Sequence, residues 1–306
     1  MSLKRSERTD RIAAIEALVC RDLGRKTQEL IEASRGDFAA AAGSLAGASG
    51  VGLITGFFVP RGDAPAAETD GPVGTALLAA ALAAFGVPAR IAVDTPCVDA
   101  VRVAIDAAGG GVGVDEVGVD DRAGIERVAR AWTQAGISHA IAIERCGRSV
   151  DGRPRNMRGV DVSPWTAPLD DLFLAGHWVR LGVGDGGNEI GMGKLPAGLI
   201  GRTVPNGALI ASTTACDHLV VAGVSNWGAY GLMAALAVLR ADWSPILARF
   251  LSAERDLAVT RAVVDKAGAI DGVSARREAT VDGFGPEIHG ALIDGLRRIA
   301  WPEAAD

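Results

Sequence analysis

The chain has 306 residues, an apolar content of 49% and a formal net charge of −6. This length and composition exclude a disordered chain and a small disulfide-dependent scaffold, because a chain of this size buries a full hydrophobic core. The acidic balance offers no basic surface of the kind that binds nucleic acid.

Three features of the sequence indicate the cellular compartment. The N-terminus lacks the apolar core of a signal peptide, and no run of about 18 uncharged apolar residues suggests a membrane span. The four cysteines are scattered, without a CxxC pair or metal-ligand spacing, which is typical of a reducing compartment. We therefore expect a cytoplasmic protein that contacts neither membrane nor nucleic acid.

Short apolar runs alternate with helical segments along the chain. Residues 1–48 are expected to be helical, because apolar residues recur there at helix spacing. Strands are predicted at 51–59, 90–94, 112–119, 138–144, 178–183 and 218–224. Helices are predicted at 72–85, 97–108, 121–136, 226–240, 244–267 and 286–299.

This alternation predicts a three-layer α/β fold, with a mostly parallel sheet covered by helices on both faces. No internal repeat or linker marks a boundary, so we expect a single domain over residues 1–306, with the helical segment 1–48 packed on it. In open parallel sheets, ligands bind beyond the carboxyl ends of the strands. Polar segments follow the predicted strands at Thr55-Gly56, Asp94, Glu144-Arg145, 184–189 and Ser225-Asn226.

The most distinctive of these segments is Gly184-Asp-Gly-Gly-Asn-Glu-Ile-Gly-Met-Gly193. Its glycines allow a sharp turn after the strand and expose consecutive peptide N–H groups to an anion. We therefore expect Gly186 and Gly187 to bind substrate.

The same segment carries candidate metal ligands. If a helix begins near Asp185, the side chains of Asp185, Asn188 and Glu189 share one face. Three oxygen-bearing side chains suit a hard cation such as Mg²⁺ or Mn²⁺. The alternative is a glycine turn with a helix cap, although two carboxylates and an amide exceed what a cap requires.

Asp70 precedes the predicted helix 72–85, within Glu68-Thr-Asp-Gly71. Asp70 is either a further metal ligand or only the cap of that helix, and the sequence leaves both open.

The loop 145–159 carries five arginines in an acidic protein. Arginine binds carboxylate or phosphate in a bidentate manner, so the loop is a candidate for anion recognition. Arg148 and Arg153 are interpreted as solvated, whereas Asn156 and Arg158 are candidates for substrate binding.

Hydroxyl, amide and backbone donors follow two further strands. Thr55 with Gly56, and Ser225 with Asn226, either bind substrate or serve as caps and packing glycines. Most of the four histidines are interpreted as structural, because no other ligand types surround them in the sequence.

Three of these motifs occur together: the glycine segment, Asn156-Met-Arg-Gly159 and Glu68-Thr-Asp-Gly71. In this combination the chain resembles the C-terminal domain of D-glutamate cyclase, from about Leu30 to the last helix. The resemblance implies an α/β fold and the conversion of D-glutamate to 5-oxo-D-proline and water.

The resemblance also implies a role for individual residues. A divalent cation, Mg²⁺ or Mn²⁺, held by Asp185, Asn188 and Glu189, with Asp70 as a further candidate ligand, would polarise the γ-carboxylate. Arg158 would bind the α-carboxylate, and Glu144 would be the base for the ammonium group, with Asp185 as second catalytic residue. The expected partner is a small anionic substrate, an acidic amino acid, and a homo-oligomer is left open.

Two other readings compete. The glycine segment also resembles the Mg²⁺-binding string of haloacid-dehalogenase-type phosphatases, but Glu68 stands where their nucleophilic Asp belongs and no strand is predicted directly before it. The other reading is a non-catalytic binder of an acidic metabolite. A dinucleotide enzyme is not favoured, since no strand precedes a G-x-G-x-x-G with an acidic residue about 20 positions on.

Overall fold

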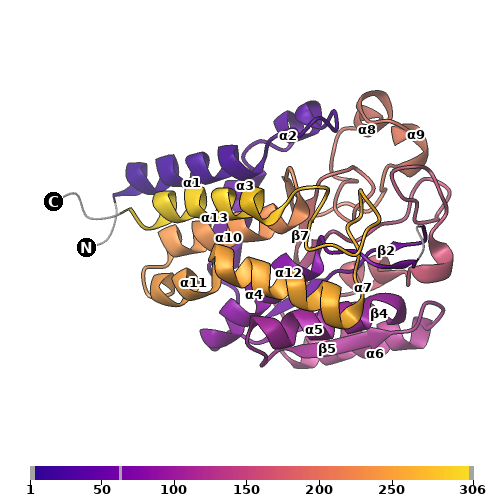
Figure 1. Cartoon of the computed structure of the whole chain (residues 1–306), viewed down its shortest axis with the longest axis horizontal. Helices are drawn as coiled ribbons and strands as arrows, with labels where there is room; N and C mark the ends of the chain where they lie inside the picture. The colour runs from indigo at the N-terminus through magenta and orange to yellow at the C-terminus, as the bar shows by residue number, and fades with distance from the viewer. Residues whose placement is uncertain (1–3, 62–63, 303–306) are drawn as a thin grey trace.

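The structure is a computed structural model that describes residues 4–61 and 64–302 (Figure 1). Its centre is a six-stranded parallel sheet with the order β5-β4-β1-β6-β7-β8. The strands are β1 (Val51–Ile54), β4 (Ala89–Asp94), β5 (Gly113–Val117), β6 (His139–Ile143), β7 (Val179–Gly184) and β8 (His218–Val221). A separate antiparallel hairpin consists of β2 (Phe58–Val59) and β3 (Ala66–Ala67).

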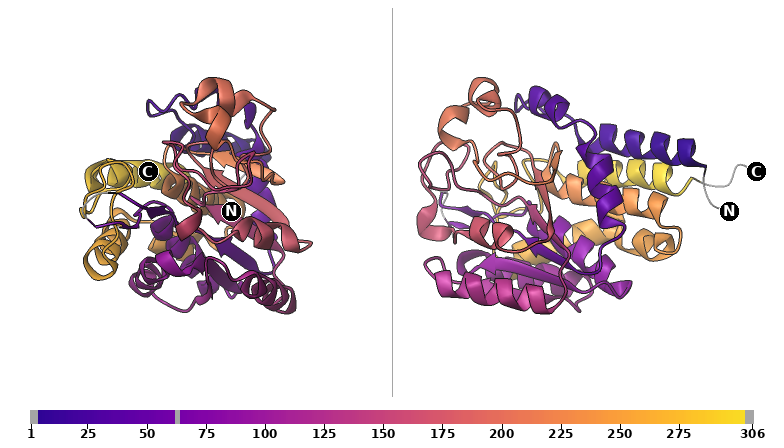
Figure 2. Two further views of the ribbon diagram at one scale, coloured as in Figure 1. Left: turned by 90° about the vertical axis from the view of Figure 1, so that its right-hand side faces the viewer. Right: turned by 180° about the vertical axis from the view of Figure 1, so that it is seen from behind.

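Helices cover both faces of the sheet, as the alternation predicts (Figure 2). One face packs against α1 (Arg5–Val19), α3 (Asp37–Leu45), α4 (Pro72–Ala84), α5 (Val98–Ala108), α10 (Ser225–Leu239), α11 (Ser244–Phe250), α12 (Ala253–Ala267) and α13 (Pro286–Ala300). The other packs against α2 (Gln28–Ala33), α6 (Arg122–Gln134), α7 (Leu169–Ala175), α8 (Leu199–Thr203) and α9 (Gly207–Ile210). Single-turn 3₁₀ helices lie at Thr95–Cys97 and Ser163–Trp165.

Strand residues supply the two cores alternately, because successive side chains point to opposite faces of a sheet. In β6, Ile141 and Ile143 belong to the core under α4 and α10, whereas Ala140 and Ala142 belong to the core under α6 and α7. β6 is therefore apolar on both faces, which is the pattern that made it recognisable in the sequence.

The order of the strands in the sheet determines where a ligand site is expected. After β1 the chain moves outward to β4 and β5, then returns to β6 on the other side of β1. Ligands bind at such a switch point, beyond the carboxyl ends of the strands. The loops after β1, β6 and β7 meet there, near α8 and α9 and away from the two ends of the chain (Figure 1).

Several predicted elements differ from the structure. The segment 51–59 is two strands with a turn at Gly56, whose φ is +107°, and 244–267 is two helices. The break falls where the Ser252 side chain accepts the backbone N–H of Arg255 and begins α12. β3 and α7 to α9 were not predicted, and β3 directly precedes Glu68, although it lies outside the main sheet.

Within 1–48 the described residues form α1, α2 and α3, and residues 1–3 lie outside the described part of the chain. Among the described residues, no helix is both long and apolar enough to cross a bilayer.

Candidate active site

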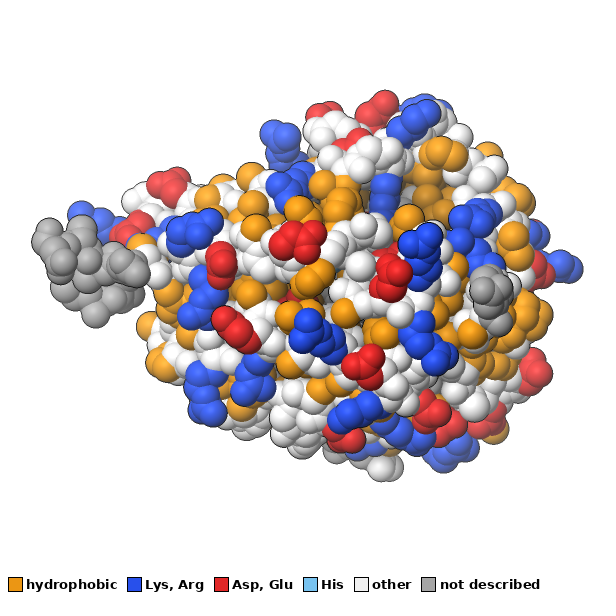
Figure 3. Space-filling view, viewed as in Figure 1, with side chains coloured by type: hydrophobic (Ala, Val, Ile, Leu, Met, Phe, Trp, Pro, Cys, Tyr) orange, Lys and Arg blue, Asp and Glu red, His pale blue; other side chains and the backbone are white. Residues whose placement is uncertain are grey.

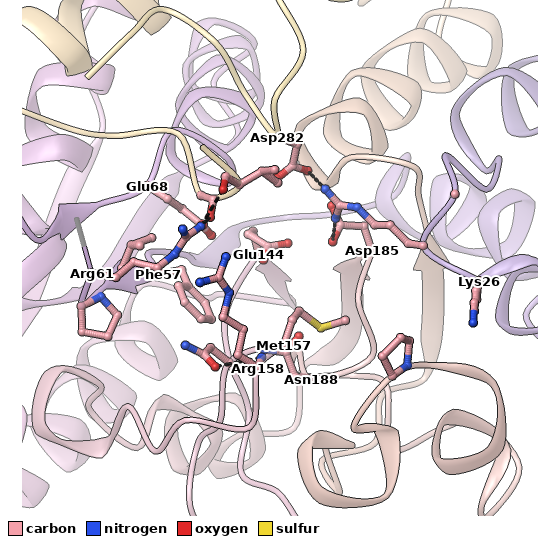
Figure 4. Close-up of a pocket in the computed structure, with 18 residues that line it drawn as sticks. Lys26, Phe57, Arg61, Glu68, Glu144, Met157, Arg158, Asp185, Asn188 and Asp282 are labelled. Atoms are coloured by element: carbon pink, nitrogen blue, oxygen red, sulfur yellow. Dashed lines mark hydrogen bonds and ion pairs between the residues drawn. The ribbon is translucent and has the colours of Figure 1, made fainter. Parts of the chain in front are cut away.

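A cavity of about 360 Å³ lies at the switch point (Figure 4). Four acidic side chains line it: Glu68, Glu144, Asp185 and Asp282. Four basic side chains line it as well: Arg25, Lys26, Arg61 and Arg158. The cavity therefore gathers opposite charges from five separate stretches of sequence.

The loop after β7 has a different shape from the one predicted. No helix begins at Asp185; the segment is a series of bends and turns. The Glu189 carboxylate folds back and accepts the backbone N–H groups of Asp185 (2.8 Å), Gly186 (2.6 Å) and Gly187 (2.7 Å). The expectation that Gly186 and Gly187 offer free amides to a substrate is wrong, because the loop supplies its own anion.

The structure also regroups the predicted metal ligands. Asp70, Asp185 and Asp282 each offer a carboxylate oxygen, and these atoms lie within 4.8 Å of one another. Glu189 meets Asp185 and Glu144 in a second such group, with both of its oxygens already accepting peptide amides. Asn188 lines the cavity, and its Nδ2 donates to the carbonyl oxygen of Arg155 (2.9 Å).

Asp70 caps a helix, but not the helix that follows it. Its Oδ1 accepts the N–H of Asn226 (2.8 Å) and its Oδ2 accepts the N–H of Ser225 (2.9 Å), at the start of α10. Asn226 in turn caps α4: its Oδ1 accepts the N–H groups of Gly71 (3.0 Å) and Gly74 (2.8 Å), at the start of that helix. This exchange locks two helix N-termini together beside the site.

Glu144 follows β6 in the left-handed region, with φ +43°. This unusual conformation aims its side chain at the cavity, where Oε2 accepts the Ser225 hydroxyl (2.6 Å). Burial, followed by the charges of Asp185 and Glu189, raises the pKa of Glu144 well above its ordinary value.

Burial likewise raises the pKa of Asp185 and of Glu68 well above their ordinary values. Arg25 opposes this shift in Asp185. In each of these two residues one carboxylate oxygen is buried without a hydrogen-bond partner among the described residues: Asp185 Oδ2 and Glu68 Oε1. Such unpaired buried oxygens mark groups that are open to a ligand.

Arg25 was not predicted as a site residue. It lies between α1 and α2, where the Asp22 side chain accepts its backbone N–H (2.8 Å). Its guanidinium pairs with Asp185 (2.6 Å) and Asp282 (2.7 Å), and the Asp185 charge raises the pKa of Arg25. Arg25 therefore joins the acids of two loops that are far apart in sequence.

The arginine loop divides only in part as the sequence analysis expects, because Arg148, interpreted as solvated, is half-buried and pairs with Asp170 and Asp171. Arg158 points into the cavity and forms no ion pair with any described residue (Figure 4). Both Arg158 and Arg153 are exposed, but Arg153 does not line the cavity and pairs with Asp161. Asn156 lines the cavity, but its Oδ1 accepts the N–H groups of Arg158 (3.0 Å) and Val160 (3.1 Å), so its carbonyl shapes the loop.

The remaining predicted binders do not line the cavity; they are Thr55, Gly56, Ser225 and Asn226. The carbonyl of Gly56 accepts from Arg145 (2.8 Å), which forms a buried ion pair with Asp94 (2.6 Å). This pair ties the ends of β1, β4 and β6 together. A Cβ on Gly71 would lie 2.7 Å from the Thr55 hydroxyl, so Thr55 packs against the start of α4.

Comparisons with known proteins show the family of this chain. A family model described as D-glutamate cyclase-like, C-terminal, matches residues 15–297, which include every site residue described above. The human protein named D-glutamate cyclase, mitochondrial, is 35% identical over an alignment of 235 residues, which covers 72% of this chain and 36% of the human protein. The match thus spans little more than a third of that relative's length. The chain belongs to the family of D-glutamate cyclase-like C-terminal domains.

Proposed function

We propose that this chain is a lyase that closes D-glutamate to 5-oxo-D-proline and releases water. The observation that carries the proposal is the cavity itself, where Arg158, without an ion pair among the described residues, faces the buried acids Glu144 and Asp185. Family membership supports the same reaction class.

The charges of the cavity complement those of glutamate. Arg158 provides a guanidinium for one substrate carboxylate, and the acidic side chains provide partners for the ammonium group. Burial and the nearby Arg158 lower the pKa of Arg61. The Arg61 guanidinium therefore lies close to that of Arg158 and provides a second positive charge in the cavity. Holding both ends of the substrate bends its chain toward ring closure, which lowers the entropic cost of the reaction.

The reaction moves two protons from the substrate nitrogen to the departing oxygen. The nitrogen must lose them to attack the γ-carbon, and the oxygen must gain them to leave as water. A carboxylate with a raised pKa is a stronger base, so Glu144 is suited to accept a proton from nitrogen and to return it to oxygen. The Ser225 hydroxyl holds Glu144 in place for this transfer.

We infer a divalent cation, Mg²⁺ or Mn²⁺, as cofactor. The residues fit such an ion: Asp70, Asp185 and Asp282 converge, all donors are carboxylate oxygens, and Asp185 Oδ2 is buried without a partner among the described residues. When bound, the cation would act as a Lewis acid on the γ-carboxylate.

The test is to incubate the purified protein with D- or L-glutamate, with Mg²⁺, Mn²⁺ or a chelator, and to follow 5-oxoproline by chiral chromatography. We expect 5-oxo-D-proline from D-glutamate, and less of it after chelation. No product from D-glutamate with either metal would overturn the assigned reaction, and full activity in the chelator would overturn the cofactor alone.

A further inference from the structure

We propose that the same site also closes γ-D-glutamyl amides, releasing the amine in place of water. The inference rests on the proposed function, because the nucleophile and the ring closure are the same. It extends the substrate class from the free amino acid to its γ-substituted derivatives.

The cavity exceeds what free glutamate requires. Its volume of about 360 Å³ lies within the ~300–1,000 Å³ that hold drug-sized ligands. Part of the lining is apolar, whereas glutamate offers only a short methylene chain between charged groups. These apolar side chains come from several segments and are called the apolar wall below: Phe57, Val59, Met157, Pro205 and Val273. A γ-substituent with apolar surface would fill this wall and would be stabilised by its burial.

The apolar wall has a fixed shape and an exit. Arg61 donates to the carbonyl oxygens of Gly272 and Val273, the latter at 2.7 Å, so the segment that carries Val273 is held against the cavity. Val273 lines the cavity and is also 52% exposed. A substituent that passes Val273 therefore reaches solvent, which permits substrates longer than the cavity.

Without a bound cation, the acidic lining favours a neutral γ-carbonyl. Glu68, Glu144 and Asp185 are buried at the cavity, and Arg25 is already engaged with Asp185 and Asp282. The γ-carboxylate of free glutamate adds a negative charge to this region, and buried like charges repel one another. An amide carbonyl adds none, while the α-carboxylate still finds Arg158.

The bond changes balance without a further reactant. The α-nitrogen forms a bond to the γ-carbon, and the bond from the γ-carbon to the substituent's nitrogen breaks. The α-ammonium group loses two protons to become the lactam N–H. The departing nitrogen gains one of them and leaves as a neutral amine, and the second is released to solvent, where an alkylamine is basic enough to take it up; no water is consumed. Glu144 is placed to carry these protons.

The experiment compares D-glutamate with γ-D-glutamyl-4-nitroanilide as probes of the whole chain. We expect 4-nitroaniline and 5-oxo-D-proline in equal amounts, with kcat/KM at least about 10-fold above that for D-glutamate. Release of D-glutamate instead of 5-oxo-D-proline would show hydrolysis and overturn the inference.

The outcomes separate the two proposals. Turnover of D-glutamate without turnover of the anilide overturns this inference and leaves the proposed function standing. Turnover of the anilide alone supports the inference and overturns the proposed function. Turnover of neither overturns both.

A matched pair of variants tests the wall. Val273→Asp places a charge on the apolar wall, whereas Val150→Asp makes the same change at a site that is 72% exposed and does not line the cavity. We expect Val273→Asp to lower kcat/KM for the anilide about 10-fold more than for D-glutamate, and Val150→Asp to leave the ratio unchanged. An equal loss for both substrates in Val273→Asp contradicts the role of the wall.

Discussion

Two groups of buried acids stand side by side at this site and differ in how their oxygens are used. Glu189 and Asp70 are 1% and 2% exposed, and every oxygen of both accepts a backbone N–H. Asp185 and Glu68 are 3% and 6% exposed, yet each keeps one oxygen without a hydrogen-bond partner among the described residues. Burial alone does not separate these two groups, whereas hydrogen-bond saturation does.

The acids whose oxygens are all hydrogen-bonded fix the backbone segments that position the other acids of the site. Glu189 fixes the turn that carries Asp185, and Asp70 fixes the start of α10, whose Ser225 holds Glu144. Variants of the two groups should therefore fail in different ways: loss of turnover in a folded protein, or loss of the fold.

The largest effect is expected for Asp185→Asn, which removes an unsaturated acid. Because asparagine keeps the shape but neither the charge nor the basicity, we expect kcat to fall by about 10³-fold. The melting temperature should change by only a few degrees. Steady-state kinetics and calorimetry measure both, with Asp217→Asn, an exposed acid paired with Arg180, as control. Wild-type turnover in Asp185→Asn would refute the assignment.

Glu189→Gln breaks the saturated group instead. Three peptide N–H groups lose a charged acceptor, and the new amide presents a donor to one of them. We expect a loss of about 3 kcal/mol in the free energy of unfolding, measured by urea denaturation. Glu126→Gln, on the exposed face of α6, is the control. A Glu189→Gln protein of unchanged stability but without activity would move Glu189 into the catalytic group.

Arg158→Ala tests the cation opposite the unsaturated acids. Since Arg158 has no ion pair among the described residues, its loss should not disturb the loop. We expect KM for D-glutamate to rise about 30-fold, near 2 kcal/mol, with kcat less affected. Arg153→Ala removes an exposed arginine of the same loop and should leave KM unchanged. Equal KM values in the two variants would contradict substrate binding by Arg158.

The fold could be predicted from the sequence because it follows from local patterns of apolar residues. Strands buried on both faces are apolar runs such as 139–143, and their alternation with helices indicates a parallel sheet. The rule that ligands bind beyond strand ends then located Glu144 and Asp185. Both line the cavity.

Long-range partners were not predictable in the same way. Arg25 and Asp282 reach the cavity from loops that follow no strand of the main sheet, so no local pattern marks them. The prediction that Asp70 caps the helix following it is wrong, because a sequence does not say which of two adjacent helix N-termini a carboxylate caps. The fold-back of Glu189 onto Gly186 likewise depends on a turn that the sequence shows only as glycines.

A further prediction concerns the cost of burying acids and is a dependence of stability on pH. Burial, followed by the charge of Asp282, raises the pKa of Asp70 to about 8, above the value in an unfolded chain. The folded state thus holds this proton more tightly than the unfolded state does. The stabilising contribution is complete below about pH 4 and is lost as the pH rises through about 8, with a slope of up to about 1.4 kcal/mol per pH unit.

Asp282→Asn sharpens the same measurement, because it removes the second cause of the shift while leaving the amides that saturate Asp70 in place. In metal-free protein unfolded by urea at pH 5, 6, 7 and 8, we expect the wild-type free energy of unfolding to fall with pH and the Asp282→Asn slope to be shallower. Identical slopes would mean that the charge of Asp282 does not reach Asp70. Asp282 and Asp70 would then be electrostatically separate, and a cation shared between them would lose its physical basis.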